Sequence, residues 1–343
     1  MNSPTLRVMV TASGGDLGQA IVKALRLGTF RVSIIGCDCD GAGIGEVFVD
    51  DFCRVPPANR ADEYIGELDA ICRRVGAQAV IPASEAEIAL CSKQGSPARL
   101  PCGVPLICLD RTWVETYGDK LKCMQALDGK LPLVRFADGG DSHAVKKLVD
   151  DVGLPLVVKA RRASGSRTLR IARSTDDLMK YLQEIDAPLV QEFMEPYEGE
   201  FSVGMFRGTD FESVINFRRE LGQQGCSWYA ETSDDRDVLE YASTAMRLTG
   251  LRGSANLQAR KTPAGVRLLE INPRFSSLVA ARTACGFRDV EWSLCEALGL
   301  KIDPPAPSYR SLRFRRFFHE VVDFGEGYCA LQKWLPIKTK DQT

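Results

Sequence analysis

Residues with hard oxygen ligands alternate with apolar residues along Ser254–Asn272, a pattern that could bind a metal ion. The alternation continues on both sides of the turn Thr262–Gly265, which predicts a β-hairpin. If the turn pairs even-numbered residues with even-numbered residues, Gln258 lies opposite Glu270. Asn272 then lies one step further along the same face, which Leu268 and the other even-numbered residues would share. Carboxylate and amide oxygens suit Mg²⁺, which takes few protein ligands and completes its shell with phosphate and water. The alternative is a solvated polar face.

The hairpin is followed by Pro273 and Arg274. A rigid turn there would present a guanidinium beside the oxygen ligands. This favours a metal site over a solvated face.

A lysine at the end of an apolar strand indicates phosphate chemistry. Lys159 follows Leu156–Val158 and precedes the small polar loop Ala163–Arg167. Such a lysine can neutralise phosphate while loop N–H groups cradle it, although an ordinary strand-end lysine would look the same. The strand Leu189–Met194 offers backbone groups that could pair with an adenine edge, and Glu200 beyond it could accept ribose hydroxyls.

Three further side chains are candidates for binding substrates. Arg218 and Arg219 end a predicted strand and could clamp a carboxylate, or could form a solvated charge pair. Glu85 follows a predicted parallel strand, on the edge where α/β folds place ligands, and could bind an amine. The basic and aromatic stretch Arg310–Phe318 could bind an anionic substrate or nucleic acid, but such a stretch more often forms an amphipathic strand.

Composition excludes several other chemistries. The chain has 343 residues with 44 Lys+Arg against 45 Asp+Glu, so no global field draws in nucleic acid or anionic membrane. No apolar run is long enough to span a bilayer, and Met1–Arg7 lacks the hydrophobic region of a signal peptide, so we expect a cytosolic protein. Only His143 and His319 are available for zinc sites or catalytic triads. The 12 cysteines form no Cys-x-x-Cys pair and are expected to be reduced thiols.

The elements that must position these residues fall into two classes. Strands and helices alternate over the first hundred residues, ending in a predicted strand at Val104–Leu109, which favours a parallel sheet covered on both faces. Asp128–Gly140 is rich in Gly and Pro and is typical of a linker. The later half mixes helices with antiparallel strand signals, so we expect an α/β domain followed by a mixed α+β fold.

A glycine cluster lies between the first strand and its helix. Gly14, Gly15 and Gly18, with Asp38 after the second strand, partly match a dinucleotide-binding fingerprint. Ser13 stands where the first glycine belongs, which makes the match weak. A tight turn that needs small residues is the alternative.

Taken in chain order, these motifs resemble the ATP-grasp superfamily, in particular the ATP-binding domains of carbamoyl-phosphate synthase large chains and related carboxylate–amine ligases. The residues that carry the resemblance are Lys120, Lys159, the loop Ser164–Arg167, Gln191–Met194, Glu200, Gln258 and Glu270–Arg274. The resemblance implies an N-terminal α/β domain (1–110), an ATP-grasp domain (111–309) with a flap at about 130–190, and a C-terminal extension (310–343). It also implies that the glycine cluster does not bind NAD.

The resemblance also implies a role for each residue. Lys120 and Lys159 would contact ATP phosphates under the flap loop, which would consist of Ser164, Gly165, Ser166 and Arg167. Adenine would lie against Glu192, Phe193 and Met194, and ribose against Glu200. Mg²⁺, or Mn²⁺ in its place, would bind Gln258, Glu270 and Asn272, and Arg274 would act on the transferred phosphoryl group.

The implied activity is ATP-dependent ligation of a small carboxylate to an amine through an acyl phosphate, on amino-acid-like substrates. A homodimer is compatible with this interpretation, and neither nucleic acid nor membrane is expected as a partner. Two alternatives stay open: a nucleotide-binding regulatory module without turnover, and an NAD(P)-dependent oxidoreductase that uses the N-terminal domain.

Overall fold

The computed structural model describes most of the chain. The described residues are 5–39, 44–162, 168–195, 197–222, 225, 227–302 and 309–316, together with the backbone of 321–323 and 328–330. No helix in these ranges is long and apolar enough to cross a membrane.

The N-terminal unit is a parallel sheet with strand order β3-β2-β1-β4, as the alternation of strands and helices predicts. Its elements are β1 (Leu6–Val10), α1 (Asp16–Leu27), β2 (Val32–Asp38), the 3-10 helix η1 (Ile44–Phe48), β3 (Asp51–Arg54), α2 (Ala61–Val75), β4 (Ala79–Ile81) and α3 (Glu85–Cys91). Successive strand residues point to opposite faces, so Val8 packs with Ile21 of α1 and Met9 packs with Leu68 of α2. The sheet is therefore covered on both sides.

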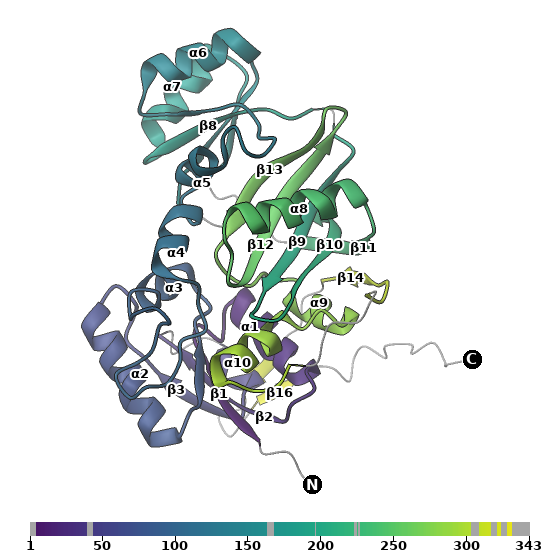
Figure 1. Ribbon diagram of the computed structural model, residues 1–343. Coiled ribbons are helices and arrows are strands. Elements are labelled where there is room, and N and C mark those ends of the chain that lie inside the picture. Colours follow the sequence, from purple (N-terminus) through teal and green to yellow (C-terminus); the bar gives the residue numbers. More distant parts are fainter. Residues whose placement is uncertain are drawn as a thin grey trace.

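A small antiparallel unit follows two connecting helices, and in Figure 1 it lies at the top. The connecting helices are α4 (Arg111–Tyr117) and α5 (Lys120–Leu127). The unit contains β5 (Phe136–Asp138), α6 (Ser142–Val152), β6 (Leu156–Ala160), β7 (Arg170–Ala172), α7 (Thr175–Glu184) and β8 (Pro188–Glu192), with strand order β5-β8-β6-β7. Both helices pack their apolar faces on this sheet.

The large sheet is antiparallel, with strand order β13-β12-β9-β10-β11-β14. Its unit contains β9 (Gly199–Arg207), β10 (Glu212–Leu221), β11 (Ser227–Ser233), α8 (Arg236–Leu248), β12 (Gly253–Thr262), β13 (Gly265–Asn272), α9 (Val279–Cys285), α10 (Asp289–Leu298) and β14 (Arg313–Arg315). A short hairpin of β15 (Val321–Asp323) and β16 (Tyr328–Ala330) follows. Helix α8 packs Val238 and Ala242 against Leu257 on one face of the sheet. The opposite face carries a second apolar cluster, which includes Phe206, and also polar side chains such as that of Gln258.

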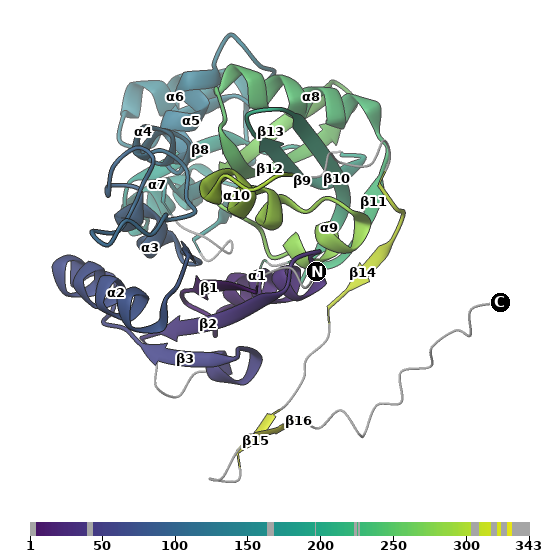
Figure 2. The same cartoon turned by 60° about the horizontal axis from the view of Figure 1, so that its bottom comes forward.

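The last helices return to the start of the chain. Val279 of α9 and Leu294 of α10 pack with Ile21 and Leu25 of α1 in one buried cluster. Figure 2 shows α9 and α10 between the large sheet and α1. The N-terminal unit and the large sheet are thereby joined through an apolar contact.

Two predicted elements differ from the structure. Val104–Leu109 forms no strand: it makes a single parallel bridge, between Leu106 and Val80, because Pro105 has no N–H to extend the ladder. The predicted linker Asp128–Gly140 contains β5, which pairs with β8. Within Arg310–Phe318, β14 pairs with β11 and exposes Arg313 and Arg315, as an amphipathic strand should, while Phe317 and Phe318 lie outside the described residues.

Candidate active site

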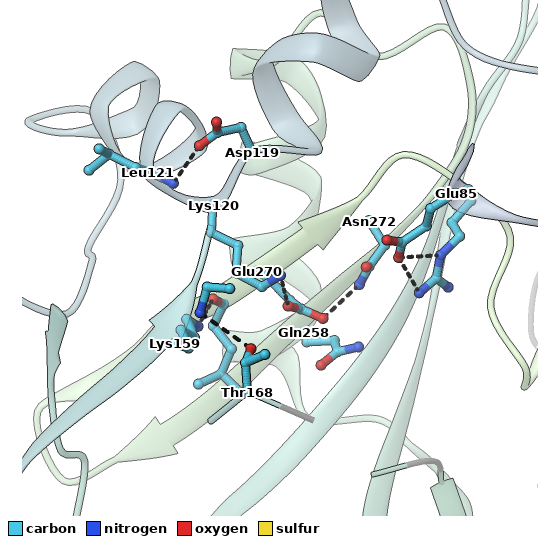
Figure 3. Close-up of polar contacts among 12 residues, drawn as sticks. Glu85, Asp119, Lys120, Leu121, Lys159, Thr168, Gln258, Glu270 and Asn272 are labelled. Carbon is cyan, nitrogen blue, oxygen red and sulfur yellow. Dashed lines mark hydrogen bonds and ion pairs between the residues drawn. The ribbon is translucent and has the colours of Figure 1, made fainter. Parts of the chain in front are cut away.

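A cavity of about 980 Å³ lies between the polar face of the large sheet and the N-terminal unit. Eight of the residues predicted from the sequence line it: Glu85, Lys120, Lys159, Glu200, Arg219, Gln258, Glu270 and Arg274. They come from α3, α5, β6, β9, β10, β12, β13 and the turn after β13. The fold therefore gathers side chains that are far apart in the sequence into one cavity (Figure 3).

The β12–β13 hairpin has the predicted register, with Gln258 opposite Glu270 and Asn256 opposite Asn272. One part of the alternation is wrong. A β-bulge inserts Leu269 as an extra residue, because Gln258 pairs with Glu270 but Ala259 pairs with Leu268. Leu268 is therefore in the core instead of on the polar face, and Leu269 lines the cavity.

The bulge also positions a lysine. The Nζ of Lys159 donates a hydrogen bond to the carbonyl oxygen of Leu269 at 3.2 Å. A bulged residue leaves the regular ladder, so its carbonyl can accept from a side chain. Lys159 thereby projects from β6 onto the edge of the hairpin (Figure 3).

Two lysines and one glutamate form a charged cluster in the cavity. The Nζ of Lys120 lies 3.4 Å from Oε2 of Glu270, and Nδ2 of Asn272 donates to Oε1 of Glu270 at 3.0 Å. Burial opposes ionisation of Glu270, but Lys120, Lys159 and the Asn272 hydrogen bond outweigh it and lower its pKa to about 2. Burial lowers the pKa of Lys159 to about 8. At neutral pH the cluster carries net positive charge, which suits a polyphosphate.

Asp119 fixes the position of Lys120. Its carboxylate caps α5 by accepting from the backbone N–H of Leu121 at 3.1 Å, and it accepts two hydrogen bonds from Arg161 at 3.0 and 2.9 Å. The backbone N–H of Lys120 in turn donates to the carbonyl of Arg161 at 3.1 Å. The start of α5 is thus tied to the chain just beyond β6, which brings the two lysines together.

Glu200 and Gln258 have partners that the sequence did not predict. Glu200, expected beside ribose, accepts from Arg219 at 2.7 Å and from Arg260 at 2.9 Å. Arg219, expected to clamp a carboxylate, also donates to Oε1 of Gln258 at 2.6 Å. In this state of the protein the amide oxygen expected to face a cation is therefore held by a guanidinium.

Arg274 and Glu85 contact each other across the cavity. Nη2 and Nε of Arg274 lie 3.2 and 3.4 Å from Oε1 of Glu85 (Figure 3). Glu85 stands at the first position of α3, whose N-cap Ser84 forms a capping box with Glu87. This ion pair joins the N-terminal unit to the turn after β13.

Other predicted residues lie outside the cavity lining. Glu192 pairs through its backbone and its carboxylate with the backbone of Arg135, while Met194 is buried. Arg218 is exposed and donates to the carbonyl of Glu198, because its neighbour Arg219 takes the cavity face of β10. The predicted flap loop, Ser164, Gly165, Ser166 and Arg167, lies outside the described residues. The roles of all of these residues stay predictions.

Several cavity residues were not identified as functional from the sequence. They include Asp16, Ser202, Asn256, Arg260 and Ser276. Asn256 and Arg260 share the even-numbered face with Gln258, so the alternation itself contained the signal. Arg260 also lies over the ring of Tyr197, 4.4 Å from its centroid.

The oxygen donors of the hairpin fit Mg²⁺. One carboxylate and two amides are hard ligands, whereas no group of three or more His, Cys, Asp and Glu suited to a metal occurs among the described residues. Glu270, Gln258 and Asn272 would thus hold a cation that takes its remaining ligands from phosphate and water.

The glycine cluster forms a tight turn. A Cβ on Gly18 would lie 2.2 Å from the carbonyl oxygen of Ala12, so the close approach of helix and strand itself requires glycine. Asp38, the candidate ribose ligand, accepts a hydrogen bond from the N–H of Gly14 at 3.0 Å. Both observations favour the turn over dinucleotide binding.

Sequence comparisons point to one superfamily. The family described as "ATP-grasp in the biosynthetic pathway with Ter operon" matches residues 184–317. A formate-dependent phosphoribosylglycinamide formyltransferase from Synechococcus sp. (strain CC9605) is 26% identical over 267 residues, which are 73% of this chain and 64% of that protein. A carbamoyl phosphate synthase large chain from Neisseria meningitidis serogroup B is 27% identical over 195 residues, 52% of this chain and 18% of that protein. The chain thus spans less than two thirds of either relative.

Solved structures share the fold. The N5-carboxyaminoimidazole ribonucleotide synthetase of Thermus thermophilus superposes with a TM-score of 0.69 at 17% identity, covering 89% of this chain and 82% of that one. The biotin carboxylase domain of the Hydrogenobacter thermophilus 2-oxoglutarate carboxylase, a dimer solved with MgADP, ADP and bicarbonate, gives a TM-score of 0.67 at 16% identity, covering 88% of this chain and 71% of that one. The family match and the sequence relatives confirm the resemblance to ATP-grasp proteins that the motifs predict, and the solved structures share the fold.

Proposed function

We propose that this chain is an ATP-dependent carboxylate–amine ligase that forms an amide through an acyl phosphate and releases ADP and phosphate. One observation carries the proposal. A single cavity holds a lysine pair beside Gln258 and Glu270 of the hairpin, and an arginine–carboxylate pair across from them. The first group suits a nucleotide polyphosphate, and the second suits the two charged substrates of a ligation.

The lysines would bind the ATP phosphates. Lys120 and Lys159 already face the carboxylate of Glu270. A bound polyphosphate would supply part of the negative charge that now comes from this carboxylate alone. Glu270, Gln258 and Asn272 would hold Mg²⁺, which neutralises charge on the phosphates when bound. Arg219 would have to leave Oε1 of Gln258 for that oxygen to face the cation.

The chemistry then needs little from the protein beyond positioning and charge. A carboxylate oxygen of the acid attacks the γ-phosphorus, and the bond to the ADP oxygen breaks. The amine nitrogen next attacks the acyl carbon, phosphate leaves, and the amine loses a proton. Arg274 would offset the charge on the transferred phosphoryl group. Glu85 would hold the ammonium form of the amine once Arg274 turns to the phosphate, and the ammonium would lose one proton to solvent before its nitrogen attacks.

The charges of the cavity favour amino-acid-like substrates. Cationic Arg219, Arg260 and Arg274 lie near anionic Glu85 and Glu200 in the same cavity. A substrate with one carboxylate and one amine could match both signs. The names of the two sequence relatives describe enzymes that act on small molecules, and the function proposed for this chain is likewise that of a small-molecule enzyme.

The test is ADP release in the presence of Mg²⁺ and a panel of small carboxylates and amines, followed by mass spectrometry for new amides. Release should depend on an acid. Glu270→Gln should lower turnover by about 100-fold or more, the scale of losing one preorganised electrostatic contact. Glu212→Gln is the matched control, because Glu212 pairs with Arg247 away from the cavity, and it should keep wild-type turnover.

Two outcomes would contradict the proposal. Tight binding of Mg·ATP without acid-dependent ADP release would favour a regulatory nucleotide-binding module. Normal turnover of a folded Glu270→Gln variant would remove the carboxylate from the mechanism.

A further inference from the structure

Asn256 presents one half of its carboxamide to the cavity and buries the other. It stands on β12 and lines the cavity. Its Oδ1 accepts a hydrogen bond from Oγ of Ser202 at 2.9 Å and a second from Nη2 of Arg282. No described residue accepts from Nδ2, and Asn256, which is 1% exposed, borders the cavity.

Arg282 determines which way the amide points. A guanidinium can only donate, so the atom that faces Arg282 must be the amide oxygen. A flip of the amide would set its NH₂ group against the guanidinium of Arg282, a donor against a donor. The N–H group is therefore locked toward the cavity.

The guanidinium of Arg282 is held by a buried ion pair and needs a glycine beside it. Arg282 is fully buried on α9 and is paired with buried Asp289, 3.4 Å away, which accepts from Ser254. A Cβ on Gly204 would lie 2.8 Å from Cζ of Arg282, so β9 carries glycine where the guanidinium crosses it. A buried ion pair is costly or neutral for stability, which favours a role in holding Asn256 over a stabilising role alone.

We propose that Asn256 is a specificity-determining residue whose Nδ2 donates to the substrate carboxylate that becomes activated, and that Arg282 is its positioning residue. The proposal rests on the function proposed above. Asn256 lies directly opposite Asn272 and two residues before Gln258 on the same strand face. Its N–H group therefore borders the oxygen donors of the hairpin, where a carboxylate must lie to meet the γ-phosphorus.

Asn256→Asp tests the donor. The new carboxylate still accepts from Ser202 and Arg282, but it places an oxygen where the N–H group stood. The KM for the acid should rise by roughly 10- to 100-fold, the effect of losing a hydrogen bond to a charged group, while the KM for ATP stays within about twofold. Arg282→Lys should raise the KM for the acid in the same direction, because the shorter donor cannot hold both Asp289 and Asn256.

Ser254→Ala is the matched control for the buried pair. It removes the 2.7 Å hydrogen bond to Asp289 without touching Asn256. If the network had a purely structural role, Ser254→Ala and Arg282→Lys would have the same effect on the KM for the acid. Our proposal predicts that only Arg282→Lys changes the KM for the acid, at equal KM for ATP.

A second measurement reads Asn256 directly. The chain has five asparagines, so ¹⁵N-asparagine labelling yields five side-chain amide pairs, and Asn256→Asp assigns one of them. Formate, acetate, hydrogencarbonate and the proteinogenic amino acids would each be titrated into protein saturated with Mg·ADP. At least one of them should shift the NMR signals of the Asn256 side-chain amide. The signals of Asn216, which is buried outside the cavity lining, should not move.

The two measurements separate the inference from the proposed function. ADP release that depends on an acid, without any shift of Asn256 or change of KM in Asn256→Asp, overturns the inference and leaves the function standing. A carboxylate that shifts Asn256 without supporting ADP release leaves the carboxylate site standing and overturns the function. A shift with nucleotide alone, and with no carboxylate, would assign Nδ2 to a phosphate oxygen and overturn the inference.

Discussion

Lys159 is held in a setting that disfavours its charge. Burial lowers its pKa to about 8, and neighbouring Lys120 acts in the same direction, while Glu270 opposes both. Because the free pKa of lysine is about 10.4, folding makes this side chain easier to deprotonate. A polyphosphate bound beside Nζ would favour the charged form and raise the pKa again.

Nucleotide binding should therefore take up a proton at alkaline pH. At pH 9 most free protein has neutral Lys159, and ATP, which is fully deprotonated there, would bind the charged form. Calorimetry in two buffers with different ionisation enthalpies should show uptake of up to about one proton at pH 9, with weaker affinity than at pH 7. Lys159→Met should abolish the uptake. Equal heats in both buffers at pH 9 would contradict the assignment of Lys159 to phosphate.

The bulge in β13 is the element that combines the core with the cavity. Leu268 and Ile271 both pack in the core although they are three residues apart, which a regular strand does not allow. The extra residue, Leu269, shifts the inward–outward alternation of the side chains by one position, so that both Leu268 and Ile271 point into the core. Its carbonyl oxygen also accepts the hydrogen bond from Lys159. One inserted residue thus serves both packing and site geometry.

Deletion of Leu269 should leave a folded protein with a weakened site. The remaining strand would alternate regularly, with Leu268 and Ile271 inward and Glu270 still opposite Gln258. Lys159 would lose its acceptor, and ATP affinity should fall by about tenfold, the effect of one hydrogen bond that involves a charged group. Thermal unfolding with and without Mg·ATP measures both quantities. Unchanged ATP affinity in the deletion variant would show that the bulge does not position Lys159.

The same hairpin shows what the sequence can and cannot predict. Alternation placed Gln258 and Glu270 on the polar face of the hairpin. The turn pairs Thr262 with Gly265, an even-numbered with an odd-numbered residue, so Gln258 lies opposite Glu270 only because of the bulge. The bulge escaped the alternation because Leu269 is as apolar as its neighbours. Asp119 was an available N-cap signal for α5, which was not predicted. The contact of Arg219 with Gln258 depends on the packing of distant strands, and no local pattern encodes it.

At the scale of the molecule, the first helix shares one core with the last two helices of the described residues. Helices α9 and α10 pack on α1, so the N-terminal unit and the large sheet bury apolar surface against each other. The Arg274–Glu85 pair adds a polar contact at the cavity, but half-exposed ion pairs contribute little stability. The apolar contact should therefore govern cooperativity.

Leu294→Ala should destabilise both parts together. Leu294 is buried on α10 in the cluster that includes α1, and truncation of such a leucine typically costs about 2–5 kcal/mol. Urea unfolding followed by fluorescence and by circular dichroism should give one shifted transition, whereas Leu248→Ala, at an exposed leucine of α8, should change little. Two separated transitions would show that the N-terminal unit folds independently.

Transfer of oxygen from acid to phosphate tests the central claim most directly. Activation of a carboxylate through an acyl phosphate places one carboxylate oxygen on the phosphate that leaves. With an ¹⁸O-labelled acid that supports ADP release, the account predicts that each phosphate released carries one ¹⁸O, seen by mass spectrometry. Phosphate without ¹⁸O, released alongside ADP and the amide product, would contradict it.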